Sequence, residues 1–140
     1  MAQLWIFYAL LSAIFAALVA IFGKIGLDKV DTNLATTIRA LVMFLFLLLV
    51  ISFQKKYLLL KQVEGMDYLF IILAGIAGAI SWLFYFLALK SGEASRVASL
   101  DRLSVVFILI FALLFLGEKF SLLKASGVAL IVVGSLLMVI

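Results

Sequence analysis

Cysteine, histidine and proline are all absent from this chain of 140 residues, and only 13% of its residues are charged. Without cysteine there is no disulfide framework and no thiolate metal site. Without histidine the chain lacks the commonest general base and metal ligand. No nucleophile–base pair and no metal-ligand cluster stands out among the other residues. We therefore predict no enzymatic activity, no metal site and no cofactor.

Apolar residues are abundant, at 69% of the chain, whereas about a quarter of a soluble domain is charged. A soluble fold of this size would expose much of that apolar surface to water, so its solvent must be lipid. The net charge of +4 does not indicate nucleic acid, because the basic residues are dispersed among short loops. The composition predicts an integral, multi-pass membrane protein that contacts the lipid bilayer.

Five hydrophobic windows meet or approach the length of about 20 residues that a helix needs to cross a bilayer core of about 30 Å. The windows are residues 3–22, 34–53, 68–89, 98–116 and 122–140. Thr32 or Asn33 is of the type that begins a helix and is the expected N-cap of the second window. We predict one all-α domain over residues 1–140, a bundle of five transmembrane helices.

Five spans place the two ends of the chain on opposite sides of the membrane. The side of the N-terminus then carries five lysines and arginines, and the other side carries six. The positive-inside rule sets orientation from this difference, which is almost nil here. Two interpretations stay open. Either the chain inserts both ways and pairs as an antiparallel homodimer, or its orientation is fixed by the translocon or by a partner such as a second five-helix chain.

Three charged residues lie within or close to the predicted membrane boundary. Without Arg39 the second window has only 14 residues, and without Asp101 and Arg102 the fourth also has 14, which is about 21 Å of helix. Ionisable residues at such depth carry a functional hypothesis by default. Trp82 and Tyr85 share a helix face at similar depth. We predict that these five residues line a vestibule that binds a small-molecule substrate.

Each of these residues also has a structural explanation. Arg39 and Arg102 can extend to the lipid headgroups along their apolar stems. Asp101 lies in the first turns of its predicted helix, where the macrodipole favours a carboxylate. An Arg39–Asp101 ion pair between the second and fourth helices is as consistent with the sequence as a substrate contact. Tyr85 can be an interface aromatic, an explanation that suits the deeper Trp82 less well.

Small residues recur at helical spacing and predict faces where helix backbones approach closely. The predicted contact positions are Ala9, Ala13, Ala17, Gly75, Ala79, Gly127 and Gly134. Because proline is absent, an interrupted helix would have to depend on glycine, and we expect any interruption at Gly75–Gly78.

The motifs resemble those of a known family. The stretch Ala88–Ser95 (ALKSGEAS), the end of the fourth window at Phe115–Lys119 (FLGEK), and Gly127 and Gly134 resemble the second part of an EamA domain. This domain is the repeat unit of the drug/metabolite transporter superfamily, and Arg39 fits the same pattern. The resemblance covers essentially the whole chain. Most members are similar to two such domains in tandem, whereas this chain resembles the single five-helix unit of a small bacterial and archaeal branch.

The resemblance implies a secondary transporter that exports a small organic metabolite across a prokaryotic plasma (inner) membrane. An odd number of helices means that two copies are inverted only by opposite insertion, which agrees with the charge count. A lipid flippase subunit and a non-transporting accessory subunit stay open as alternatives. Two features depart from the pattern: residues 98–101 (ASLD) contain no early proline, and helix one lacks the glutamate of four-helix multidrug relatives. A proton-coupled cation exporter of that type is therefore disfavoured.

Overall fold

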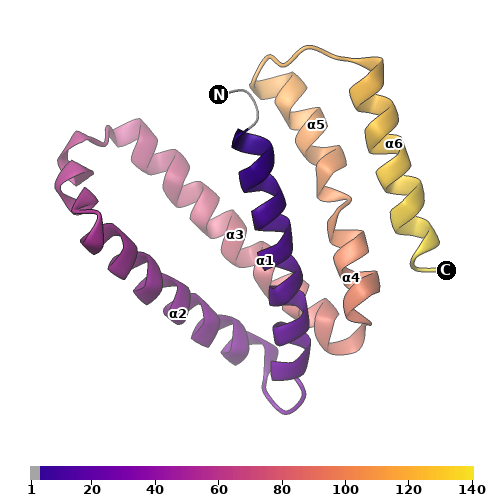
Figure 1. Cartoon of the computed structure of the whole chain (residues 1–140), viewed down its shortest axis with the longest axis horizontal. Helices are drawn as coiled ribbons and strands as arrows, with labels where there is room; N and C mark the ends of the chain where they lie inside the picture. The colour runs from indigo at the N-terminus through magenta and orange to yellow at the C-terminus, as the bar shows by residue number, and fades with distance from the viewer. Residues whose placement is uncertain (1–3) are drawn as a thin grey trace. The chain divides into compact units, whose positions relative to one another are not determined.

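The computed structural model describes residues Leu4–Ile140, so the predicted helix start at Gln3 lies outside the described residues. The described chain is helical and contains no β-strand. Figure 1 shows its elements, which are α1 (Leu4–Gly26), α2 (Thr32–Phe53), the short 3-10 helix η1 (Lys56–Gln62), α3 (Gly65–Ser91), α4 (Ala94–Asp101), α5 (Ser104–Phe115) and α6 (Leu122–Leu137).

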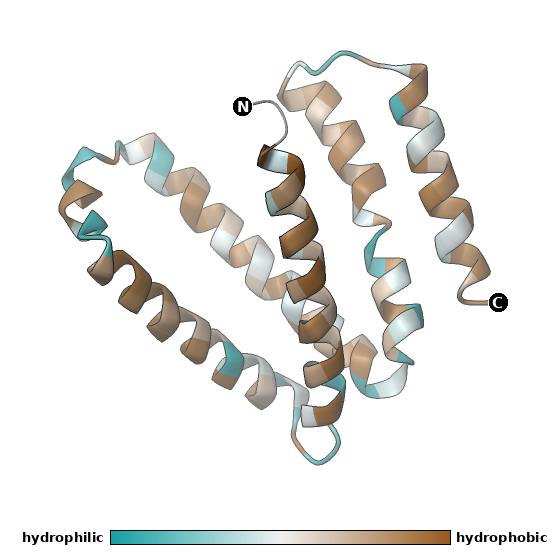
Figure 2. Cartoon of the chain, in the orientation of Figure 1, coloured by the Kyte–Doolittle hydropathy of each residue, from teal (hydrophilic) through white to brown (hydrophobic). Residues whose placement is uncertain are grey.

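Four segments are long and apolar enough to cross a membrane: α1, α2, α3, and α4 with α5 taken as one stretch. Hydrophobic residues cover most of these helices, as Figure 2 shows. The fifth, α6, is apolar but has 16 residues, about 24 Å of helix. This helix ends at Leu137, with Met138 as its C-cap, and not at Ile140 as the hydrophobic window predicted. The all-α membrane architecture is confirmed, with four candidate spans and one shorter apolar helix.

The described chain divides into two compact units. The α2–α3 unit comprises Gly23–Lys90, that is, the last turn of α1, then α2, η1 and α3. The α4–α6 unit comprises the described residues up to Phe22 together with Ser91–Ile140. In the α2–α3 unit η1 packs against α2, and the Tyr68 hydroxyl donates a hydrogen bond to the Leu60 carbonyl at 3.0 Å.

Asp31 is the N-cap of α2, so the prediction of Thr32 or Asn33 was wrong. The Asp31 Oδ1 atom accepts hydrogen bonds from the N–H groups of Asn33 at 2.9 Å and Leu34 at 3.0 Å. Its carboxylate satisfies two unpaired donors and also complements the positive end of the helix dipole. The helix therefore begins at Thr32, two residues before the edge of the hydrophobic window.

The fourth hydrophobic window, predicted as one helix over residues 98–116, is divided between α4 and α5. The N–H groups of Arg102 and Leu103 bond to the carbonyls of Ser99 and Leu100, three residues earlier, at 3.1 and 2.9 Å. Such bonds belong to a 3-10 helix, whose turn is tighter than that of an α-helix. The fourth candidate span is thus one apolar stretch of 22 residues, but its α-helical hydrogen bonding is interrupted at Arg102 and Leu103.

The interruption contains neither glycine nor proline. Ser99, Asp101 and Ser104 place three weak helix formers within six residues, which lowers the cost of leaving the α-helical pattern. By contrast, α3 runs unbroken from Gly65 to Ser91. The expectation that an interrupted helix would depend on glycine, as at Gly75–Gly78, was therefore wrong.

In the α4–α6 unit, α6 packs against both α4 and α5. The turn that reverses the chain after α5 has Gly117 at φ +63°, a left-handed conformation that glycine adopts without steric cost. The Glu118 N–H then bonds back to the Ala112 carbonyl at 3.2 Å and closes the helix end. The short link therefore lets α6 turn back and pack against α5.

Candidate functional site

Arg39 lies about two turns into α2, and its side chain contacts aromatic rings of α3. The guanidinium carbon Cζ is 3.3 Å from the centroid of the Trp82 ring and 5.5 Å from that of Phe86. A cation within about 6 Å of a ring centroid is attracted by the negative face of the ring. This side-chain contact between α2 and α3 thus brings together two residues that are 43 positions apart in the sequence.

The rings that receive Arg39 form an aromatic cluster of Trp82, Tyr85 and Phe86. Trp82 meets Tyr85 at 5.5 Å and 76°, and it meets Phe86 at 6.0 Å and 61°. These edge-to-face arrangements suit the ring quadrupoles and fix the orientation of each ring. Phe86 is only 3% exposed. Sequence reasoning missed Phe86, although its i+4 spacing from Trp82 places both on one helix face.

The contact of Arg39 with the cluster leaves its charge uncompensated within the α2–α3 unit. No carboxylate of the described residues in this unit lies within ion-pair distance of the guanidinium. A stacked guanidinium uses its face on the ring, whereas its five N–H donors point outward from its edges. The arrangement is therefore suited to hold a carboxylate or phosphate at the edge of Arg39 and an apolar group against the rings.

Asp101 and Arg102, the other two predicted vestibule residues, belong to the α4–α6 unit. Asp101 is the last residue of α4 and Arg102 follows it at the interruption before α5. Because α4 begins at Ala94, Asp101 does not lie in the first turns of its helix, and the macrodipole explanation for its carboxylate was wrong. An Arg39–Asp101 ion pair stays a prediction.

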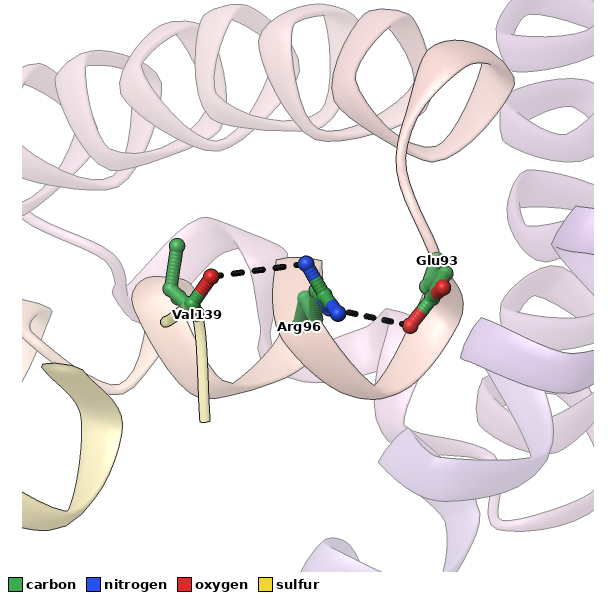
Figure 3. A network of polar contacts seen from close by, with 3 residues as sticks. All are labelled: Glu93, Arg96 and Val139. Atoms are coloured by element: carbon green, nitrogen blue, oxygen red, sulfur yellow. Dashed lines mark hydrogen bonds and ion pairs between the residues drawn. The ribbon is translucent and has the colours of Figure 1, made fainter. Parts of the chain in front are cut away.

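A second arginine, Arg96 of α4, is held in a different way. Its Nε atom forms an ion pair with the Glu93 Oε2 atom at 3.0 Å, and a terminal nitrogen donates to the Val139 carbonyl at 3.4 Å (Figure 3). The Ser99 hydroxyl donates to the Ser135 carbonyl at 3.3 Å. These contacts join α4 to the end of α6, which is a structural role.

The predicted helix-packing faces lack a partner within their own units. A Cβ atom built at Gly75, Gly127 or Gly134 meets no other atom within 4 Å. Ala9, Ala13, Ala17 and Ala79 are exposed. The role of these positions in helix contacts therefore stays a prediction.

Gly23 makes a close approach that sequence reasoning missed. A Cβ atom at Gly23 would lie 3.3 Å from Cζ of Phe86 and 3.5 Å from Cδ1 of Leu89. The last turn of α1 therefore reaches α3 next to the aromatic cluster.

Comparison with known proteins gives a match over nearly the whole chain. Residues 3–140 match the EamA-like transporter family. A protein of a Sinorhizobium species, named as an uncharacterized transporter in the cobO 3′ region, is 44% identical over 140 residues. The alignment covers 100% of this chain and 99% of that protein, so the two are nearly equal in length. No solved structure matches the chain.

Proposed function

We propose a substrate class and an assembly for this chain from the premise that it belongs to the EamA-like transporter family and is a membrane transporter. The resemblance found in the FLGEK turn and its flanking motifs is thereby confirmed. The substrate that we propose is a small organic metabolite with a carboxylate or phosphate group and an apolar part. The chain would export it by secondary transport across a prokaryotic plasma membrane.

The stacking of Arg39 on Trp82 is the observation that carries this proposal. At 3.3 Å from the ring centroid the guanidinium is held in place, and the α2–α3 unit supplies no carboxylate to neutralise it. A positioned, uncompensated cation beside an apolar surface is complementary to an anion with an apolar substituent. For Asp101 and Arg102 we propose contacts with other groups of the substrate, an amine for Asp101 and a second anionic group for Arg102.

The assembly that we propose is an antiparallel homodimer, because transport by alternating access requires two inverted halves. Transporters of this kind move one inverted half against the other around a central site, and this chain has the length of a single half. Its basic residues are almost equally divided between the two sides. The open positions at Gly127 and Gly134 offer a face on α6 for close contact with a second copy.

Reporters that work on one side of the membrane only, fused to each terminus in turn, test this assembly. Dual topology requires each terminus to report on both sides in comparable amounts. If each terminus reports on a single side, the self-inverted homodimer is wrong. An oppositely oriented second chain would then have to supply the other half.

The substrate site can be tested through its own indole, because the chain has two tryptophans, Trp5 and Trp82. In a Trp5→Phe background the fluorescence of Trp82 reports binding during titration with anionic metabolites of differing apolar size. Arg39→Gln should weaken binding of the best ligand by about tenfold or more, since it removes a charge-assisted hydrogen bond. Lys56→Gln, which removes one charge from η1, should leave the affinity unchanged. Equal affinity in the Arg39→Gln variant would contradict the proposed site.

A further inference from the structure

The segment that follows α1 is held against the end of α3 by two lysines. The Lys24 ammonium donates hydrogen bonds to the carbonyls of Leu89 at 2.6 Å and Lys90 at 3.3 Å. The Lys90 ammonium donates to the Val30 carbonyl at 2.8 Å. Each lysine thus binds backbone of the segment to which the other is attached. We call Lys24 and Lys90 the lysine clasp.

The clasp borders a pocket. Lys24, Leu27, Asp28 and Lys90 line a pocket of about 110 Å³ that is open to one side. This is smaller than the range of about 300–1,000 Å³ that most small-molecule sites occupy, so the pocket has room only for a small polar group. Leu27 is only 2% exposed and Leu89 is fully buried, so the backbone around the pocket is anchored by apolar packing.

The hydrogen bonds of the clasp explain why the lysines contact the backbone, but they do not use all the charged groups that line the pocket. Lysines near the end of a helix stabilise its last carbonyls, which explains the Lys24 contacts. An ammonium has three N–H donors, and the one described hydrogen bond of Lys90 leaves two for a ligand. Asp28 contributes a carboxylate to the lining that the clasp contacts do not use. The pocket therefore presents two positive groups and one negative group.

We infer that this pocket binds a phosphate that carries a primary amine, the chemistry of phosphoethanolamine. Lysine ammonium groups bind phosphate as point charges, whereas planar recognition of carboxylates favours arginine. The Lys90 ammonium, which has donors left, matches a phosphate next to the positive charge of Lys24, and the Asp28 carboxylate matches the amine. A free metabolite and the headgroup of a membrane lipid both have this chemistry. The site is separate from the Arg39 site and does not depend on the proposed transport.

Isothermal titration of the purified full chain in detergent tests the inference with three probes. O-phosphoethanolamine carries both groups, inorganic phosphate lacks the amine, and ethanolamine lacks the anion. We expect O-phosphoethanolamine to bind about tenfold more tightly than either, since each charge-assisted contact contributes about that factor. Equal affinity for inorganic phosphate would overturn the assignment of the amine to Asp28, and absence of binding would overturn the site.

Matched variants locate the binding. Lys90→Gln keeps a donor for the Val30 carbonyl but removes the charge, and should weaken O-phosphoethanolamine and inorganic phosphate by about tenfold each. Asp28→Asn should remove the preference for O-phosphoethanolamine while phosphate still binds. Lys29→Gln, in the same segment but outside the pocket lining, should bind like the wild type. If Lys29→Gln loses as much affinity as Lys90→Gln, the charge of the segment as a whole is responsible and the pocket is not the site.

Two bilayers then separate the possible sources of the ligand. The chain is placed in nanodiscs of phosphatidylcholine alone or with phosphatidylethanolamine, and O-phosphoethanolamine is titrated. Loss of binding only with phosphatidylethanolamine identifies the lipid headgroup as the ligand, and undiminished binding identifies a free metabolite. Arg39→Gln should bind O-phosphoethanolamine normally, so failure of the Arg39 site and failure of this pocket give different results.

Discussion

Arg39 and Arg96 are both helical arginines, but their partners differ in kind. Arg39 lies against the Trp82 ring at 3.3 Å, whereas Arg96 forms an ion pair with Glu93 at 3.0 Å and donates to the Val139 carbonyl. A ring attracts a cation without neutralising it, whereas a carboxylate cancels the charge and occupies the N–H edges. The partner of a cation therefore separates a structural arginine from one that can still bind a ligand.

The same difference extends to the two units. In the α2–α3 unit the described partners of Lys24 and Lys90 are backbone carbonyls, which carry no net charge. In the α4–α6 unit Lys124 forms an ion pair with Glu118 at 2.8 Å, as Arg96 does with Glu93. Of these four cations, the two in the α2–α3 unit have described partners without net charge, whereas the two in the α4–α6 unit form ion pairs with carboxylates. Anion binding is expected in the former.

The largest effect should come from exchanging the two arginines separately for alanine. We expect Arg39→Ala to lower transport into liposomes by about a hundredfold, because up to about 3 kcal/mol of charge-assisted binding is lost. Arg96→Ala should lower it by less than about threefold. The assay uses the metabolite that the Trp82 titration selects, with thermal unfolding as the check on folding.

Arg39→Lys sharpens the same comparison. Lysine keeps the charge but lacks the planar fork and the stacked face, so its transport should fall between those of wild type and Arg39→Ala. If a well-folded Arg96→Ala protein stops transporting while Arg39→Ala does not, the distinction between ring-bound and carboxylate-bound arginines is wrong.

Replacing one glycine in each unit by leucine should give the next largest effect, on the free energy of unfolding. Gly23→Leu places a side chain where Cζ of Phe86 lies 3.3 Å from the Cβ position, and overpacking of this kind costs about 1–3 kcal/mol. Gly127→Leu meets open space in α6 and should leave the unfolding of the single chain unchanged. Denaturant unfolding in detergent measures both variants.

The glycine variants also test the predicted contact face. If Gly127 lies between two copies, Gly127→Leu should weaken dimerisation, which energy transfer between labelled copies in liposomes measures. Unchanged energy transfer would exclude this α6 face from the dimer contact.

Hydropathy predicted the spans well because the bilayer imposes both their length and their composition. The ends of the helices were less predictable. Residues Ala94–Val97 belong to α4 but have too little apolar character to enter the hydrophobic window. The window therefore began at Ala98, and Asp101 was placed at the wrong end of its helix. The interruption at Arg102 was missed because it depends on hydrogen bonding and has no proline or glycine to signal it.

Part of the candidate site could be predicted from the sequence, because some of its residues lie deep within the predicted membrane helices. Arg39 and Trp82 were selected because charge and a large aromatic at that depth need an explanation, and the structure places them in contact. The participation of Phe86 depends on the direction in which the Arg39 side chain crosses from α2 to α3, which one sequence does not specify. The lysine clasp was not foreseen, because its partners are backbone carbonyls and every residue has one.

Removing the Ser99 hydroxyl, which joins α4 to α6, should have a smaller effect on the stability of the chain. Ser99→Ala removes the hydrogen bond to the Ser135 carbonyl, and such bonds between membrane helices contribute about 0.6 kcal/mol. Thr37→Ala is the control, because the Thr37 hydroxyl bonds to the Asn33 carbonyl within its own helix. The unfolding midpoint should fall for Ser99→Ala and stay nearly constant for Thr37→Ala. An equal fall in both variants would mean that the Ser99 contact does not join the helices.

The smallest effect should come from Glu118 and Lys124, an ion pair whose side chains are about half exposed. A double-mutant cycle with Glu118→Gln and Lys124→Gln should give a coupling of about 0.2–1 kcal/mol that declines in high salt. Transport by both single variants should stay near the wild-type rate, because a pair closed within its own unit leaves no charge for a ligand. If Glu118→Gln stops transport at unchanged stability, a carboxylate-bound charge is functional after all. The partner of a cation would then no longer distinguish the two units, and the FLGEK turn would belong to the transport machinery.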